Sequence, residues 1–492
     1  MYHKTLYIFC LLCLSAVNIK AQDITFFRTY GSGAYDAAES VWPCNDSGFV
    51  VVGATSGYNV AGTDLLIFRT DKLGNQTWLK TYGGNGNEWA KCIIPVPNSS
   101  DFIIVGHTNS FGFGQYDFYV LRINQTGDTI WTRTFGGPDW DLALSADTTY
   151  DGNIVITGET SSFGAGNKDV FVIKISPNGS LIWQQTIGGA DDDIANVIFE
   201  DRDTNLIVAG STLSYGAGQR DYYLIKLNKS GDTLFTKTFG TALDEWFSSG
   251  DMYFDNGNNM SYCIGGNFYD AGEDIVVESL SRITANGIFN YATQGNPSNQ
   301  YERRKTIVRN EAAWGTFYLV NTYKDNPFAS FDINLRRTNY GFGTYSYSSI
   351  IGSLSDEFTN DIRKTYDNGY VMVGRIDNYG PGSSACFIAK TDSTGLAAIT
   401  PTVGSNEISS PKLRIYPNPA TNMIYVDLHN EAHQILSAEI TNMQGQTIKH
   451  ATPSFISGPT LSISLQNLMP GAYILKLITP IQIYAYRIIV AE

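Results

Sequence analysis

Carboxylic acids recur at one position along the first 360 residues of the chain. Each lies five residues after a glycine, or seven residues after it in the case of Glu302; the set is Asp36, Glu88, Asp141, Asp193, Glu245, Glu302 and Glu357. Several carboxylates around one axis would suit a hard cation such as Ca²⁺, and two at a suitable separation could cleave a glycosidic bond. Alternatively, each carboxylate accepts amide hydrogens from the preceding glycine turn. We favour this structural role, because a binding site rarely repeats its residues sevenfold.

A second set of aspartates follows the glycine-rich loops of the repeats: Asp64, Asp117, Asp169, Asp221, Asp274 and Asp332. We interpret these residues as turn-stabilising as well, although glycine-rich acidic loops can also hold calcium. Calcium is therefore the one cofactor that the sequence suggests, and we otherwise expect none.

More varied chemistry appears at a third repeated position, just after the second strand expected in each repeat. It holds Ala54, His107, Glu159, Ser211, Asn267, Thr322 and Arg375. We expect these residues and the carboxylates to share one rim, with Trp89, Trp140 and Trp246 nearby as stacking surfaces for sugars. The ligand-binding candidates are therefore His107, Glu159, Arg375 and these three tryptophans, and ordinary surface variation is the alternative. An acidic rim favours neutral or cationic ligands.

Enzyme signatures are scarce. His107 is the one histidine between residues 22 and 395, and the chain has no Gly-x-Ser-x-Gly motif or phosphate-binding loop. We therefore predict no catalytic residues and no enzyme; the alternative is a glycosidase or lyase that uses the rim carboxylates. A formal net charge of −14 argues against a nucleic-acid partner.

The elements that position these residues come from a repeat. Glycines 31, 83, 136, 188, 240, 295 and 352 recur every 52 to 57 residues, most of them after an aromatic–Thr–aromatic phrase such as Trp131–Phe135. Each unit has four short strand patterns, two of them continuously apolar as in strands buried on both faces. Seven such units over residues 22–395 predict an all-β protein, a seven-bladed β-propeller with four-stranded antiparallel blades. The last unit lacks its aromatic strand, and the strand at 24–30 could complete it.

The two ends of the chain differ from the repeats. Residues 1–21 have the pattern of a signal peptide, and no later segment is long and apolar enough to cross a membrane. Residues 396–410 read as a linker without pattern, and residues 411–492 as a small C-terminal β-sandwich. The widely spaced Cys44, Cys92, Cys263 and Cys386 predict buried free thiols rather than a disulfide framework.

Two family resemblances add to this. The repeats resemble the seven-bladed β-propeller repeats of secreted bacterial proteins. Residues 411–492 look like the C-terminal sorting domain of the type IX secretion system, through Tyr416-Pro-Asn-Pro419, Asn442-Met-Gln-Gly445 and Leu468-Met-Pro-Gly-Ala-Tyr473. This resemblance implies the secretion machinery as partner, removal of the domain, and a mature protein that is secreted or attached to the outer cell surface.

Together these features predict a monomeric, non-catalytic binding or scaffold module for a glycan or protein ligand. A structural adhesion component is a further alternative.

Overall fold

The computed structural model describes residues 24–254 without a break, residues 258–396 with gaps at 271–274, 295–301, 313–315, 325–329, 340–344, 353–354, 379 and 381, and shorter segments between 402 and 491. The elements it contains are β-strands. None of the described segments forms a helix of a length and apolarity that could span a bilayer.

Up to residue 403 the strands form antiparallel sheets, which we call blades 1 to 7. Blade 1 holds β2 (Asp36–Pro43), β3 (Phe49–Thr55), β4 (Asp64–Thr70) and β5 (Gln76–Tyr82); blade 2 holds β6 (Glu88–Pro95), β7 (Phe102–Thr108), β8 (Asp117–Ile123) and β9 (Thr129–Phe135). Blade 3 holds β10 (Asp141–Thr148), β11 (Ile154–Thr160), β12 (Asp169–Ile175) and β13 (Leu181–Ile187); blade 4 holds β14 (Asp193–Glu200), β15 (Leu206–Thr212), β16 (Asp221–Leu227) and β17 (Thr233–Phe239).

The remaining three blades follow the same order. Blade 5 holds β18 (Asp244–Phe254), β19 (Met260–Asp270), β20 (Ile275–Thr284) and β21 (Phe289–Gln294); blade 6 holds β22 (Glu302–Ala312), β23 (Thr316–Lys324), β24 (Asp332–Asn339) and β25 (Tyr345–Ile351). Blade 7 holds β26 (Asp356–Lys364), β27 (Tyr370–Asp377), β28 (Ser384–Thr391), β1 (Phe26–Tyr30) and β29 (Thr402–Val403).

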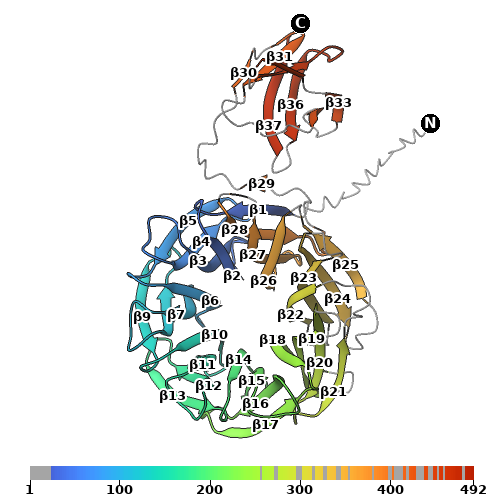
Figure 1. Ribbon diagram of the computed structural model, residues 1–492. Coiled ribbons are helices and arrows are strands. Elements are labelled where there is room, and N and C mark those ends of the chain that lie inside the picture. The colour runs from blue at the N-terminus through green and yellow to red at the C-terminus, as the bar shows by residue number, and fades with distance from the viewer. Residues whose placement is uncertain are drawn as a thin grey trace, which may run out of the picture.

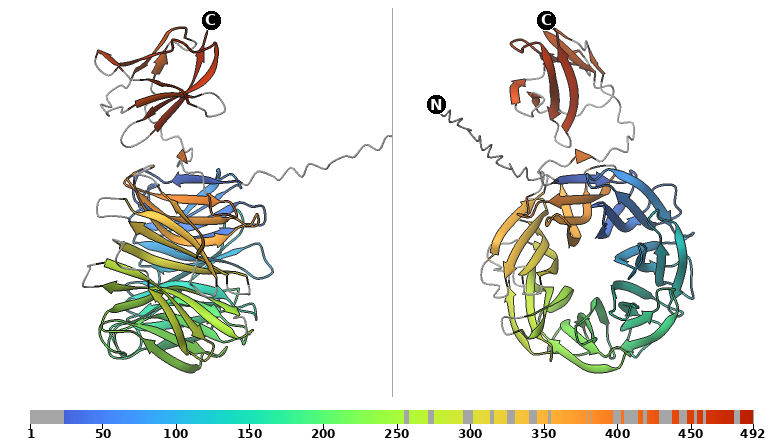
Figure 2. Two further views of the ribbon diagram at one scale, coloured as in Figure 1. Left: turned by 90° about the vertical axis from the view of Figure 1, so that its right-hand side faces the viewer. Right: turned by 180° about the vertical axis from the view of Figure 1, so that it is seen from behind.

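The blades are arranged around a common centre, and the first strand of each repeat lies innermost (Figure 1). Figure 2 shows the same ring edge-on and from behind. The middle strands are rich in Val, Ile and Phe, which favour strands, and every residue of β3, β11 and β15 is buried. The outer β9, β13 and β17 are mostly exposed. The predicted all-β protein with repeated four-stranded antiparallel blades is therefore confirmed.

The first and last parts of this region meet in blade 7. β1 pairs antiparallel with β28, from Phe26 opposite Lys390 to Tyr30 opposite Cys386. Alternate side chains of β1 face opposite sides, so that Phe26 packs toward blade 1 while Phe27 stacks on Phe387 at 5.3 Å between ring centres. The predicted pairing of the N-terminal strand with the last blade is present. Within the predicted linker, Thr402–Val403 pairs in parallel with β1.

The repeated aromatic residues of the outer strands join neighbouring blades. The indole nitrogens of Trp78, Trp131 and Trp183 donate to backbone carbonyls in the next blade's hairpin, at 3.1 Å, 3.2 Å and 3.2 Å. Their rings lie against the glycine of that hairpin, Gly127 in the case of Trp78. These glycines have a positive φ, 78° at Gly127, which a tight hairpin requires. The aromatic residues of the repeated phrase therefore pack between neighbouring blades.

Two further four-stranded sheets lie in the C-terminal part. One contains β30 (Arg414–Tyr416), β31 (Met423–Asp427), β35 (Thr460–Ser464) and β34 (Ser454–Ser457); the other contains β33 (Thr447–Ala451), β32 (Ser437–Thr441), β36 (Gly471–Ile478) and β37 (Ile483–Val490). Apolar side chains of both sheets, such as Val426 and Leu475, belong to one buried cluster. The predicted signal peptide, 1–21, lies outside the described residues, as do residues 397–401 and 404–410 of the predicted linker. The four cysteines after the signal sequence are free and buried, as predicted.

Candidate functional site

The repeated carboxylates at the start of the innermost strands are buried and bind the preceding turn. Asp141 Oδ2 accepts a hydrogen bond from the amide of Gly137 at 2.7 Å, and Glu88 and Asp193 bind Gly84 and Gly189 in the same way. Asp36 binds Ser32 and Glu245 binds Thr241 equivalently. The repeated carboxylates therefore stabilise the turns that precede them, which is the role favoured from the sequence.

The carboxylates do not form the open acidic rim that was the alternative to this structural role. Asp36, Glu88, Asp141 and Asp193 are fully buried, and their oxygens point back into the turns rather than toward the centre. Glu357 is also fully buried, and the side chain of Glu302 lies outside the described residues. In the described part of the chain, no group of three or more His, Cys, Asp or Glu side chains is placed to hold a metal ion.

Two carboxylates face the same glycine at the blade junctions. A Cβ added to Gly83 would overlap Asp64 of blade 1 and Glu88 of blade 2, and Gly188 stands in the same way between Asp169 and Asp193. Burial, and then the neighbouring Glu88, raises the pKa of Asp64 to about 6. Burial also raises the pKa of Asp169, with Asp193 adding to the shift. Adjacent like charges disfavour double ionisation, so these junctions take up protons more readily than the unfolded chain.

Because of these junctions, the free energy of unfolding should fall as the pH rises from about 4 through about 6. The folded protein binds more protons than the unfolded chain in this window, so the free energy of unfolding decreases with pH. Asp64→Asn, which cannot ionise, should melt at a higher temperature than the wild type at pH 8 and flatten this dependence. Asp191→Asn, an exposed side chain of a related turn, is the control. An Asp64→Asn protein with the wild-type pH profile would rule out the junction as its source.

Three of the predicted ligand-binding residues come together in one aromatic row. The ring of His107 lies 5.8 Å from that of Trp89 and 5.7 Å from that of Tyr116, which in turn lies 4.7 Å from Trp140. His107 is buried, whereas Trp140 is 43% exposed. Burial, with a smaller effect from Lys91, lowers the pKa of His107 to about 4, so its imidazole is neutral at pH 7. His107 thus supports Trp89 and Tyr116 from within rather than meeting a ligand itself.

The other three candidates lie elsewhere. Glu159 forms an ion pair with Lys168 at 2.8 Å, and Arg375 forms one with Asp377 at 2.9 Å while lying over the ring of Phe358. Trp246 is separate from the aromatic row and lines the central cavity.

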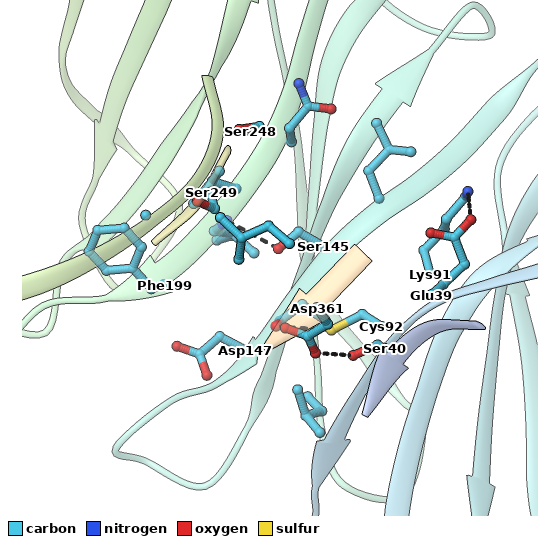
Figure 3. Close-up of a pocket in the computed structure, with 18 of the residues that line it drawn as sticks. Glu39, Ser40, Lys91, Cys92, Ser145, Asp147, Phe199, Ser248, Ser249 and Asp361 are labelled. Carbon is cyan, nitrogen blue, oxygen red and sulfur yellow. Dashed lines mark hydrogen bonds and ion pairs between the residues drawn. The ribbon is translucent and has the colours of Figure 1, made fainter. Parts of the chain in front are cut away.

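The central cavity, which we call the channel, has a volume of about 540 Å³. Its walls come from the innermost strands of all seven blades, with Ile307 as the contribution of β22. Figure 3 shows Glu39 and Lys91 on one wall, Asp361 beside Ser40, and Asp147 and Phe199 on other walls.

A β-bulge in each innermost strand shapes the channel. The pairing register shifts between Ala38 and Ser40, and at the equivalent place in every other blade. The extra residue therefore interrupts the regular alternation of side chains. In six blades this residue lines the channel, and we call the set the bulge ring: Glu39, Lys91, Leu144, Asn196, Ser248 and Asn360.

In six blades a glycine in the second strand leaves room for the bulge. A Cβ on Gly158 would overlap the carbonyl oxygen of Leu142, and Gly53, Gly106, Gly210 and Gly374 are equally close to the bulged strand. Blade 6 has Asn321 at this position, and there the register skips from Arg304–Thr322 to Ile307–Val320. The wider interruption therefore falls in the repeat that lacks this glycine.

A second ring of channel residues lies three positions after the bulge ring. This distal ring consists of Trp42, Ile94, Asp147, Phe199, Asp251 and Arg363. Arg363 lies over the ring of Trp42 at 5.2 Å, and its Nε is 3.3 Å from Asp361 Oδ2. Asp361 also accepts a hydrogen bond from Ser40 Oγ at 2.8 Å. In the bulge ring, Lys91 and Glu39 form an ion pair at 2.9 Å.

Sequence reasoning missed both rings because it followed the residues that repeat. The sequence does contain a signal for both rings. In every blade but blade 6, the bulge ring lies three residues and the distal ring six residues after the repeated carboxylate. Their variation from one repeat to the next contrasts with the invariant glycine and acidic positions beside them.

Comparison with known proteins identifies two parts of the chain. Residues 414–491 match the secretion system C-terminal sorting domain, and residues 151–181 and 205–233 match a domain of unknown function (DUF5122) that is a β-propeller. No curated protein matches the chain.

Among solved structures, PorZ, a surface component of the type IX secretion system of Porphyromonas gingivalis, is 12% identical with a TM-score of 0.40; the match covers 92% of this chain and 59% of PorZ. Puromycin hydrolase is 10% identical with a TM-score of 0.45, over 82% of this chain and 62% of the hydrolase. The β-propeller domain of the Trilobed protease from Pyrococcus furiosus is 7% identical with a TM-score of 0.43, over 77% of this chain and 99% of that domain. These similarities carry no inference about activity.

The C-terminal match agrees with the motifs at Tyr416–Pro419 and Leu468–Tyr473, and the repeat match lies within blades 3 and 4. The chain is therefore a β-propeller protein with a type IX secretion sorting domain, exported to be secreted or attached to the cell surface.

Proposed function

We propose that the seven blades form one closed propeller that acts outside the cell as a non-catalytic binding module, with its ligand in the central channel. The two C-terminal sheets form a small β-sandwich that directs export through the type IX machinery. Pairing of β1 with β28 supports a closed ring, and the cluster shared by the two C-terminal sheets supports a sandwich.

The contrast between the constant and the variable positions of the repeat carries this proposal. The buried carboxylate and the bulge glycine recur in six of the blades, 1 to 5 and 7. The bulge residue that they place in the channel changes from acid to base, alkyl, amide and hydroxyl. A fold that needed only to close around its centre would gain nothing from five different residue types, polar and apolar, at these six positions. A lining of this kind suits the recognition of one asymmetric ligand.

The size and chemistry of the channel limit the ligand. A volume of about 540 Å³ lies within the range of small-molecule sites. The walls combine aromatic rings, hydroxyl groups and charged groups, as sugar-binding sites do. The row from Trp89 to the exposed Trp140 adds an aromatic surface to the rim on which a longer glycan could stack.

The test is to screen the purified mature protein against a glycan and small-molecule array, and to incubate every ligand it retains for turnover. We expect saturable binding of at least one soluble ligand without chemical change. An array without any bound ligand would contradict a small-molecule binding function and favour a structural adhesion component.

One observation favours a second candidate function, that of a glycosidase or lyase. Burial, and then the negative charge of Asp251, raises the pKa of Asp147 to about 6, within an asymmetric cavity. A carboxyl group with such a pKa can act as a general acid near neutral pH. Under this hypothesis Asp147→Asn would abolish turnover of a bound glycan while the glycan was still retained.

A further inference from the structure

We propose that an aromatic platform at the junction of blades 2 and 3 binds a neutral glycan chain that extends outward from the channel. The platform consists of Trp89, Phe113 and Trp140. This inference rests on the proposed function, because it names the ligand class and extends the same site onto the rim.

The inner end of the platform lies at the mouth of the channel. Trp89 is the second residue of β6, and its equivalent in blade 5, Trp246, lines the channel. Lys91, two residues after Trp89, also lines the channel. A glycan held in the channel would therefore pass the half-buried Trp89 where it leaves on the side of blade 2.

The outer end is an exposed ring stacked on a buried one. The rings of Trp140 and Tyr116 lie 4.7 Å apart at an angle of 30°, and Trp140 is 43% exposed whereas Tyr116 is buried. One face of the indole is therefore supported by Tyr116, which leaves the other face to the solvent. Tyr116 in turn packs against the buried ring of His107. A sugar can stack its C–H face on an aromatic ring that is already fixed in this way.

Phe113 adds a third ring, which does little for the fold because its side chain is 79% exposed. It precedes Gly114, where an added Cβ would overlap the carbonyl oxygen of Gly137, so this loop lies against the turn that leads to Trp140. The amide of Phe113 donates to Asp117 Oδ2 at 2.7 Å and fixes the loop. Exposed apolar side chains grouped in this way mark a surface for a ligand or a partner.

The platform departs from the repeat. At the next two junctions the same positions hold different residue types: Ala165 and Ala217 for Phe113, Lys168 and Arg220 for Tyr116, and Asp192 and Asp244 for Trp140. In blade 3, Lys168 forms its ion pair with Glu159, the equivalent of His107. The blade therefore folds with an ion pair at these positions as well as with aromatic rings. A set of rings at one junction is what a binding site requires and what the fold does not.

The chemistry of the platform favours a neutral glycan over a protein. The rings are confined to one junction, whereas a specific protein interface involves about 20–30 residues on each side. The exposed side chains of Gln115 and Asp139 flank the rings and can form hydrogen bonds with sugar hydroxyl groups. Asp139 is the only charged residue in the segments 109–115 and 138–140, so its carboxylate would repel an anionic glycan.

The experiment is calorimetric titration of the full chain with cellohexaose, laminarihexaose, mannohexaose and chitohexaose, each beside its own disaccharide. Only the longer chain reaches from the channel to the platform. We therefore expect at least one hexasaccharide to bind at least about tenfold more tightly than its disaccharide.

Trp140→Ala and Phe113→Ala should each lower the affinity for that hexasaccharide at least about threefold, which is within the range for one aromatic contact. The affinity for the disaccharide should not change. Two variants are used, each checked for an unchanged melting temperature, so that one that fails to fold does not decide the result. Tyr215→Ala is the matched control, because Tyr215 is 45% exposed on the equivalent loop of blade 4; it should keep the full affinity.

Three results would overturn this inference while leaving the channel site in place. They are equal affinity for the two chain lengths of all four sugars, full hexasaccharide binding by both folded variants, and an equal loss of affinity in Tyr215→Ala. Absence of binding by all four hexasaccharides would also overturn it and would leave the platform to a protein partner. The array described above then decides separately whether the binding function itself fails.

Discussion

Replacing Phe26 with alanine should destabilise the whole propeller by about 3–5 kcal/mol, the usual cost of removing a buried aromatic ring. The Phe26 side chain is buried between blades 7 and 1, with its ring 6.2 Å from that of Phe49 and in contact with Gly74. β1 is also the only segment that brings N-terminal residues into blade 7 in the described chain. Loss of this contact should therefore loosen both blades. Thermal melting and hydrogen exchange of the full chain measure the effect.

The control is Phe113→Ala, because the side chain of Phe113 is 79% exposed and its removal should leave the melting temperature unchanged. Exchange in Phe26→Ala should rise around residues 385–391 as well as around β1, since these segments are paired. Unchanged exchange at 385–391 would mean that β1 does not hold the ring closed.

Replacing Gly158 with alanine should be nearly as harmful, on the order of 3 kcal/mol, at the upper end of the range for overpacked cores. The added Cβ would overlap the carbonyl oxygen of Leu142, which is backbone and cannot swing away. β10 and β11 would have to shift apart locally; in blade 6, where Asn321 replaces the glycine, the pairing register is interrupted over more residues. Denaturant unfolding of the variant, compared with wild type, measures the cost.

Gly250→Ala, in the innermost strand β18 of blade 5, is the matched control. A Cβ there would make only ordinary contacts, with no atom closer than 3.4 Å, so we expect little change in stability. Equal stability of the two variants would show that the bulge does not depend on glycine at the facing position.

The sequence predicted the blades well because their structural residues repeat. The aromatic residue of the outer strand, the hairpin glycine and the buried carboxylate each perform a local task that recurs in every unit. Trp131 illustrates this, since its ring and indole nitrogen contact the same hairpin of the next blade as their equivalents do. The missing strand of the last unit could be found by the same comparison.

The channel could not be predicted in the same way. A bulge such as that after Ala38 shifts the alternation of side chains by one residue, so a simple two-residue period assigns the wrong face beyond it. The side chains beyond the bulge, such as Glu39 in the channel wall, were therefore missed, whereas the carboxylates expected on the rim are buried in the turns. His107 was expected at the surface because it follows a strand, but Trp89 and Tyr116 cover it. Burial of this kind depends on contacts between strands that the local sequence does not show.

The most direct test of the channel as the binding site is to fill it. Leu144 belongs to the bulge ring, and Leu144→Trp would place a large ring in the cavity without removing a charged or hydrogen-bonding group. Ile130→Trp, on the exposed outer strand β9, is the control of equal bulk. The measurement is the affinity of both variants for the ligands that the wild type retains on the array. We predict that Leu144→Trp loses binding at an unchanged melting temperature while Ile130→Trp keeps it; full binding by a folded Leu144→Trp protein would contradict the account.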